Sequence, residues 1–196
     1  MRRLCKVLIL SAAVALAWAP TPARADGFFS PFIGVNFANN SVDRNNSPKG
    51  KLNYGFDGGW MGAGVAGGEL DFGYAPNFFG QQGDFGDNHV LTVMGNLIVG
   101  VPVGGTRGAG VRPYGTIGVG LIRTQVTGTP GLFGVPKIDS NEFGLDAGAG
   151  VMGFFGDHVG LRGDIRYFRN LQGNTINNLD WGSFHFWRGS IGLLLR

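Results

Sequence analysis

The sequence predicts an all-β protein: an eight-stranded antiparallel up-and-down transmembrane β-barrel, preceded by a cleavable signal peptide. Three observations predict it. Stretches of about ten residues alternate apolar with polar or glycine residues, the connections between them alternate long and short, and the N-terminus has the pattern of an export signal. Successive side chains of a strand point to opposite faces, so a period of two gives one apolar and one polar face. An outer-membrane barrel turns the apolar face to lipid and the polar face inward.

The N-terminal segment predicts a signal peptide over residues 1–25 and a barrel domain over residues 26–196. Arg2, Arg3 and Lys6 precede an apolar run over residues 7–18, and Ala23-Arg24-Ala25 matches a cleavage site. The apolar run is shorter than the roughly 20 residues of a spanning helix. We therefore expect the mature chain to begin at Asp26.

The charge balance and the cysteine content narrow the possible classes of protein further. Residues 1–25 hold four of the 16 basic residues and none of the 13 acidic ones, so residues 26–196 carry 12 basic and 13 acidic residues. That balance, without a basic run, argues against nucleic-acid binding. The single cysteine, Cys5, lies in the expected signal, so no disulfide is expected. Residues 26–196 contain no run of 18 apolar residues. A closed barrel is then the way to pair every backbone amide in a membrane.

Alternating runs bounded by turn residues predict eight strands. They cover about residues 28–38, 53–66, 69–77, 89–101, 111–123, 142–155, 158–169 and 184–195. Gly67-Gly68 predicts a tight hairpin between the second and third strands, because glycine accepts the positive φ of such turns. Gly156-Asp157 predicts the turn between the sixth and seventh.

Four longer, polar segments predict surface loops at one end of the barrel. They cover residues 39–52, 78–88, 124–141 and 170–183. In an outer-membrane barrel the long loops lie outside the cell, and the tight turns and both termini are periplasmic.

The face that we expect to meet lipid is apolar and has no charge at its central positions. It includes Leu70, Phe72, Tyr74, Leu91, Val93, Leu97, Val99, Ile117, Val119, Leu121, Phe143, Leu145, Val151, Phe155, Ile191, Leu193 and Leu195. We expect some of the large aromatic residues near strand ends or in loops to form interfacial girdles. The candidates are Tyr54, Trp60, Tyr74, Tyr114, Tyr167, Trp181 and Trp187.

The opposite face carries four acidic and four basic residues that we expect to lie in the lumen. They are Glu69, Asp71, Asp146, Asp164, Arg112, Arg162, Arg166 and Arg188. The lumen of an eight-stranded barrel is just wide enough for side chains to fill it. A structural network of ion pairs is the favoured interpretation, and a gated or selective channel is the alternative.

No arrangement of residues in the sequence predicts a catalytic, cofactor or metal site. His89, His158 and His185 are far apart in the sequence and show no metal-ligand spacing. Glu69 and Asp71 share a face, but facing arginines favour ion pairing over acid–base chemistry. Two Gly-x-Gly-x-x-Gly stretches begin at Gly62 and Gly148, and neither is followed by the helical pattern of a dinucleotide site. We therefore expect no cofactor and no enzymatic activity.

Three segments resemble the generic outer-membrane β-barrel domain family, the group of small surface barrels of the OmpA and OmpX type. They are residues 62–74, 112–120 and 161–168. The resemblance implies the barrel fold and a place in the bacterial outer membrane, and it implies no shared catalytic site. Some small outer-membrane barrels are lipid A deacylases with a His-x-Ser pair. In this chain the residues two positions after the histidines are Leu91, Gly160 and Trp187, so that pair is absent. Family members usually end on an aromatic residue, whereas this chain ends on Arg196.

The function we expect is that of a non-enzymatic surface barrel. Its loops would serve envelope integrity, adhesion or surface interaction, since recognition commonly lies on loops of a rigid scaffold. Expected partners are outer-membrane lipid and the outer-membrane assembly machinery, and we expect a monomer. One alternative is a narrow channel or carrier for small apolar molecules. The other is a secreted soluble β-barrel that binds an apolar ligand.

Overall fold

Eight strands form one closed antiparallel barrel in the computed structural model, which describes residues 25–37, 50–79, 87–104, 108–127, 138–171, 175–176, 179–180 and 184–196. The barrel strands are β1 (Ala25–Phe37), β2 (Lys51–Gly62), β3 (Ala66–Pro76), β4 (Asn88–Gly100), β5 (Gly110–Val126), β6 (Ile138–Phe154), β7 (Val159–Asn170) and β10 (His185–Leu195). Each pairs with its neighbour in sequence, and β1 pairs with β10 to close the ring. The fold prediction is confirmed for the barrel; the expected signal peptide lies outside the described residues, except for Ala25.

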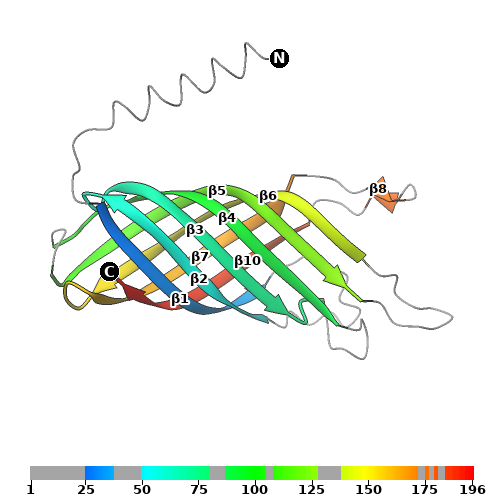
Figure 1. The fold of residues 1–196 in the computed structure, drawn as a ribbon, viewed down its shortest axis with the longest axis horizontal. Helices are drawn as coiled ribbons and strands as arrows, with labels where there is room; N and C mark the ends of the chain where they lie inside the picture. The colour runs from blue at the N-terminus through cyan, green and yellow to red at the C-terminus, as the bar shows by residue number, and fades with distance from the viewer. Residues whose placement is uncertain are drawn as a thin grey trace, which may run out of the picture.

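All eight strands are tilted in the same sense around a long, narrow barrel (Figure 1). The chain leaves β10 at the end where β1 begins, and the three short turns lie at this end too. Their described residues are 63–65, 101–104 with 108–109, and 155–158. The four longer connections join the strands at the opposite end. We call the two ends the turn end and the loop end.

Side chains alternate between exposed and buried along nearly every strand. In β5, for example, Ile117 and Val119 are more than half exposed, whereas Thr116, the residue before Ile117, is buried. The large apolar side chains of the exposed set form a belt around the barrel, and the buried set fills the lumen. A soluble barrel would have an apolar interior and a polar outside, so this arrangement contradicts the secreted soluble alternative.

The predicted hairpin at Gly67-Gly68 is wrong. The turn lies four residues earlier: its central residues, Ala63 and Gly64, have φ of 49° and 70°, and the Val65 amide donates to the Gly62 carbonyl. Two positive φ values are typical of the type I′ turns that match strand twist. Position 67 requires glycine for a different reason: a Cβ there would lie 1.7 Å from the Trp60 carbonyl oxygen and clash with it.

Two strands, β5 and β6, extend clearly further at the loop end than predicted. β5 continues to Val126 and β6 begins at Ile138, so both ends of the loop expected over residues 124–141 are strand. Within the expected loop 170–183, β8 (Thr175–Ile176) pairs with β9 (Leu179–Asp180). Beyond the hydrocarbon layer both faces of a strand meet water, so the alternation that marks a strand in the sequence disappears there.

No helix among the described residues has the length and apolar character needed to cross a bilayer.

Candidate functional site

All eight charged residues predicted for the lumen are buried inside the barrel: Glu69, Asp71, Asp146, Asp164, Arg112, Arg162, Arg166 and Arg188. They come from β3, β5, β6, β7 and β10, and they point inward because each lies in phase with the buried set of its strand. Seven of them form one contiguous network at mid-height. Arg112 lies apart, nearer the turn end.

Arg166 is the centre of this network. Its Nη2 atom lies 2.7 Å from Glu69 Oε1 and 3.2 Å from Asp164 Oδ2, and its Nη1 atom lies 3.3 Å from Asp71 Oδ2. Its side chain is completely buried. A buried guanidinium is stable only with such partners, because its desolvation is costly.

Arg162 makes a second set of contacts toward the turn end. Its Nη2 atom lies 2.7 Å from Glu69 Oε2, and its Nε atom donates to Asp164 and to the Tyr114 hydroxyl. The Tyr114 hydroxyl in turn donates to Asp164 Oδ2 over 2.8 Å. The same guanidinium lies 4.8 Å from the centre of the Tyr114 ring, within cation–π range.

Arg188 completes the network on the loop side. Both of its terminal nitrogens donate to the Asp71 carboxylate. Its guanidinium carbon lies 4.6 Å from the Phe32 ring centre and 4.8 Å from that of Phe168. Bidentate pairing and stacking together fix the position of this side chain.

Sequence reasoning missed three polar residues that contact the predicted lumen arginines: Asp57, Tyr114 and Asp26. Asp57 is buried on β2 and lies 3.3 Å from Arg162 and 3.4 Å from Arg166. Its position in the alternation of β2 was the signal that could have placed it inside. Tyr114 was a girdle candidate, and that prediction is wrong, because the side chain lies in the lumen.

The third missed residue, Asp26, belongs to a separate group at the turn end. Its carboxylate pairs with Arg112 over 3.3 Å and with Arg196. Both arginines also lie about 5 Å from the centre of the Phe154 ring.

The corrected membership changes the charge of the central network. The five carboxylates Asp57, Glu69, Asp71, Asp146 and Asp164 surround the three guanidinium groups of Arg162, Arg166 and Arg188. The predicted balance of four acidic and four basic residues is therefore wrong for this network, where acidic residues are in excess.

Apolar clusters lie in the lumen on both sides of the network. The turn-end cluster contains Phe28, Met61, Ile98, Tyr114, Met152, Phe154 and Leu194. The loop-end cluster contains Ala75, Phe78, Val90, Met94, Ile122, Phe168 and Phe186, with Phe79 and Phe184 packed against it. The lumen is thus filled in three layers, and the turn-end layer also holds the charged group of Asp26, Arg112 and Arg196.

The outer surface near the loop end carries several of the predicted girdle residues. The rings of Tyr54 and Tyr74 lie 5.5 Å apart on β2 and β3, and those of Tyr167 and Trp187 lie 5.1 Å apart on β7 and β10. Trp60 is exposed near the turn end. Trp181 lies outside the described residues.

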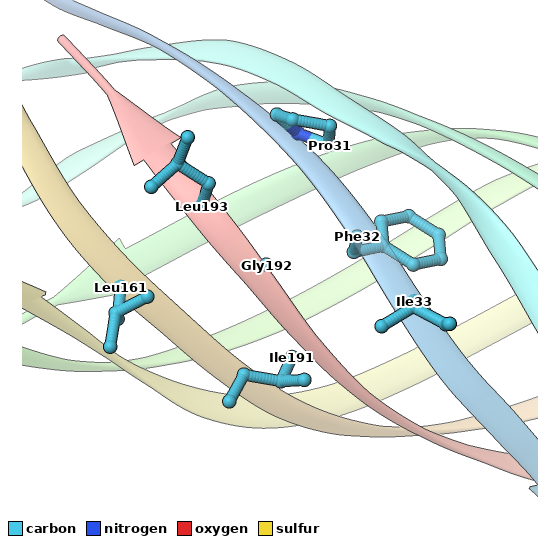
Figure 2. A pocket seen from close by; sticks show the side chains of 7 residues that line it. All are labelled: Pro31, Phe32, Ile33, Leu161, Ile191, Gly192 and Leu193. Carbon is cyan, nitrogen blue, oxygen red and sulfur yellow. The ribbon is translucent and has the colours of Figure 1, made fainter.

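The wall of the barrel has a shallow apolar groove where β1 meets β10. Pro31, Phe32 and Ile33 line one side, and Ile191, Gly192 and Leu193 with Leu161 line the other (Figure 2). Its volume is about 380 Å³. The β1–β10 ladder has no paired residues at Ser30 and Pro31, and Pro31 has no N–H to donate.

The structure gives no geometry for catalysis at the histidines. His89 stacks near Tyr74 on the outer face of β4, His185 lies near Tyr167 on β10, and His158 lies in a turn at the other end. Among the described residues, no group of three or more His, Cys, Asp or Glu side chains is arranged to hold a metal ion.

A closed barrel with an apolar outer belt, aromatic residues at its rims and a polar filled lumen defines a transmembrane β-barrel of the bacterial outer membrane. Residues 8–189 match the family model described as outer membrane protein beta-barrel domain. The chain belongs to this family, and it is an outer-membrane protein. A search of curated protein sequences finds no significant match.

Solved structures agree on the fold. The chain is similar to Neisserial surface protein A, with a TM-score of 0.60, 15% identity and coverage of 86% of this chain and 95% of the other. Outer membrane protein H of P. aeruginosa gives a TM-score of 0.50 and 20% identity, with coverage of 86% and 99%. The attachment invasion locus protein Ail of Yersinia pestis, in complex with the heparin analogue sucrose octasulfate, gives 0.50 and 15%, with coverage of 86% and 99%. These three are described as a surface protein, an outer membrane protein and an attachment invasion locus protein.

Proposed function

We propose that this protein is a non-enzymatic surface barrel: a rigid, sealed frame that presents its loops outside the cell for envelope integrity, adhesion or surface interaction. The observation that carries the proposal is the three-layer filling of the lumen. A solute would have to displace two apolar clusters and a network of buried ion pairs. Function is then left to the loop end and to the outer wall.

The proposal includes the surroundings that such a barrel needs. Export would use residues 1–25 as a signal peptide, with Asp26 as the first residue of the mature chain. The assembly machinery would insert the barrel, lipid would cover the apolar belt, and the barrel would act as a monomer. The structure of Ail in complex with a heparin analogue supports a binding role for a barrel of this fold, since its description names a bound ligand.

Two experiments test the proposal. Proteoliposomes containing the refolded protein should show no more flux of potassium or a small sugar than empty liposomes, with an open porin as positive control. In cells, replacement of residues 38–50 by a short turn should reduce surface attachment or detergent resistance to the level of a deletion strain. The trimmed barrel must still sediment with the outer membrane and still shift on a gel when boiled. Flux through the barrel above that of empty liposomes, or full attachment and detergent resistance of the strain with the trimmed loop, would contradict the proposal.

The groove between β1 and β10 favours a second candidate function, a carrier for small apolar molecules. It is apolar, and it lies at the strand seam where the ladder is interrupted. Under this alternative, uptake of a small alkane by cells should depend on the protein. Replacement of Ile191, an exposed residue of the groove lining, by tryptophan would fill the groove and abolish the uptake, whereas loop trimming would leave it unchanged.

A further inference from the structure

Asn96 lies between two carboxylates in the centre of the lumen. It faces Glu69 across the β3–β4 ladder, and on the other side Gly118 pairs with both Asn96 and Asp146. Because Gly118 has no side chain, the side chains of Asn96 and Asp146 reach the same space above it. All three polar side chains are at least nine-tenths buried.

The amide of Asn96 can satisfy only one of its two acidic neighbours. Its Nδ2 group donates to Glu69 Oε1 over 3.1 Å. A methyl group on Gly118 would lie 1.7 Å from Asn96 Oδ1 and 2.6 Å from Asp146 Oδ1, so these two acceptor oxygens converge there. Turning the amide over would move the oxygen–oxygen contact to Glu69 without removing it.

Asp146 has weaker compensation than the other carboxylates of the network. Neither of its oxygens accepts a hydrogen bond, and Asn96 Oδ1 accepts none, within the part of the chain that the structure describes. Among the described residues, its one ion pair is with Arg166 Nη1 over 3.7 Å. By contrast, Asp164 accepts hydrogen bonds from Tyr114, Arg162, Arg166 and Ser190.

The surrounding charges increase the demand for a positive charge at this point. The charged groups that act on Asp146 are Arg166, Arg188, Asp71 and Glu69. Arg166 is shared with four further carboxylates, and Arg188 is engaged by Asp71. A buried negative charge without a partner is strongly unfavourable.

We propose that Asn96 Oδ1 and Asp146 form a site for one additional monovalent cation, either a proton shared between the two oxygens or a sodium or potassium ion bound by them. Both sources supply the same chemistry, one positive charge between two oxygen ligands. The site goes beyond the proposed surface function, and it makes the sealed lumen dependent on a cation that the protein's own arginines do not supply.

The test compares Asp146→Asn with Asp164→Asn in barrels refolded into detergent micelles and unfolded with urea. Asparagine at 146 removes one of the two excess negative charges and gives Asn96 Oδ1 an amide donor, so the unfolding midpoint of this variant should equal or exceed that of wild type. Asp164→Asn removes a carboxylate with four donors, so its midpoint should fall clearly. A loss for Asp146→Asn as large as that for Asp164→Asn would overturn the proposal.

Two measurements on the wild-type barrel distinguish the sources. A shared proton gives an infrared carbonyl band of a protonated carboxylic acid, which shifts on deuteration and is lost in Asp146→Asn. A bound alkali ion instead gives a higher unfolding midpoint after refolding in NaCl or KCl than in choline chloride of equal concentration, as expected for ligand linkage. If the wild type shows neither the band nor the salt difference, the proposal is wrong even if both variants fail to fold.

Discussion

Arg188 on β10 binds Asp71 on β3 with both terminal nitrogens, although β1 and β2 lie between these strands in the barrel wall. The pair therefore crosses the lumen rather than following the sheet. Phe32 and Phe168 stack against the guanidinium and exclude water from it. The contact ties the closing strand to the first half of the barrel.

Breaking this pair on one side should be costly. Arg188→Met keeps the length and packing of the side chain but leaves Asp71 with Arg166 alone. We expect it to lower the free energy of unfolding by about 3–5 kcal/mol, the cost of removing one partner of a buried ion pair. Adding Asp71→Asn should recover part of that loss. Urea unfolding of the two single variants and the double variant measures the coupling, and additive losses would contradict the contact.

The outer belt makes a prediction that depends on depth. Val119→Arg places a charge on the exposed face in the middle of β5, where we expect a cost of about 2–4 kcal/mol in a lipid bilayer. Leu171→Arg, at an equally exposed position beyond the end of β7, is the matched control and should cost about 0–1 kcal/mol. Refolding equilibria in vesicles compare the two, and equal costs would show that depth in lipid does not matter.

Gly67 should tolerate no side chain. Its Cβ would strike the Trp60 carbonyl, so Gly67→Ala should disturb the β2–β3 ladder and lower the unfolding midpoint. The control is Gly153→Ala, where the nearest atom to the new Cβ is the Leu161 carbonyl oxygen at 3.9 Å, an ordinary contact. The unfolding midpoint of that variant should equal or exceed that of wild type, because alanine loses less conformational entropy than glycine when it folds into a strand. Equal behaviour of the two alanines would contradict the geometry of the turn region.

The loop-end cluster should contribute to stability without acting as the only seal. Phe186 packs on the rings of Phe78 and Phe168, at 5.2 Å and 4.9 Å between centres. Phe186→Ala should cost about 3–5 kcal/mol by leaving a cavity. Proteoliposomes with this variant should remain tight to potassium, because the charged layer and the turn-end cluster are intact. Phe37→Ala, on the outer face of β1, is the control for loss of an aromatic ring.

The sequence was sufficient to predict the barrel, because the period of two and the alternation of loop lengths are independent signals of the same fold. The period of two also places the charged residues on the inward face of the strands, so Arg166 and Asp146 could be placed in the lumen. The position of the β2–β3 turn could not, because Gly64 and Gly67 are equally permissive residues. Which glycine turns the chain depends on the ladder register.

The composition of the charged network was harder to predict than its existence. Asp57 lies in a strand dominated by glycine and aromatic residues, and it becomes part of the network only when β2 closes against β3. Tyr114 lies near a strand end, where tyrosine is expected at the membrane rim, but it is in phase with the buried set of β5. Partners brought together across the lumen depend on the shear of the barrel, which one sequence does not reveal.

Adjacent positions on β5 test the central claim, that the apolar face meets lipid and the polar face is sealed inside. The only cysteine of the chain, Cys5, lies in the expected signal peptide, so Thr116→Cys and Ile117→Cys each give a single thiol in residues 26–196. Thr116 is buried, and Ile117 is 61% exposed. In folded barrels in vesicles, a membrane-soluble maleimide should label Ile117→Cys alone, and a charged aqueous maleimide should label neither. Both variants should label after unfolding in urea. Labelling of folded Thr116→Cys by the aqueous reagent would contradict a sealed lumen.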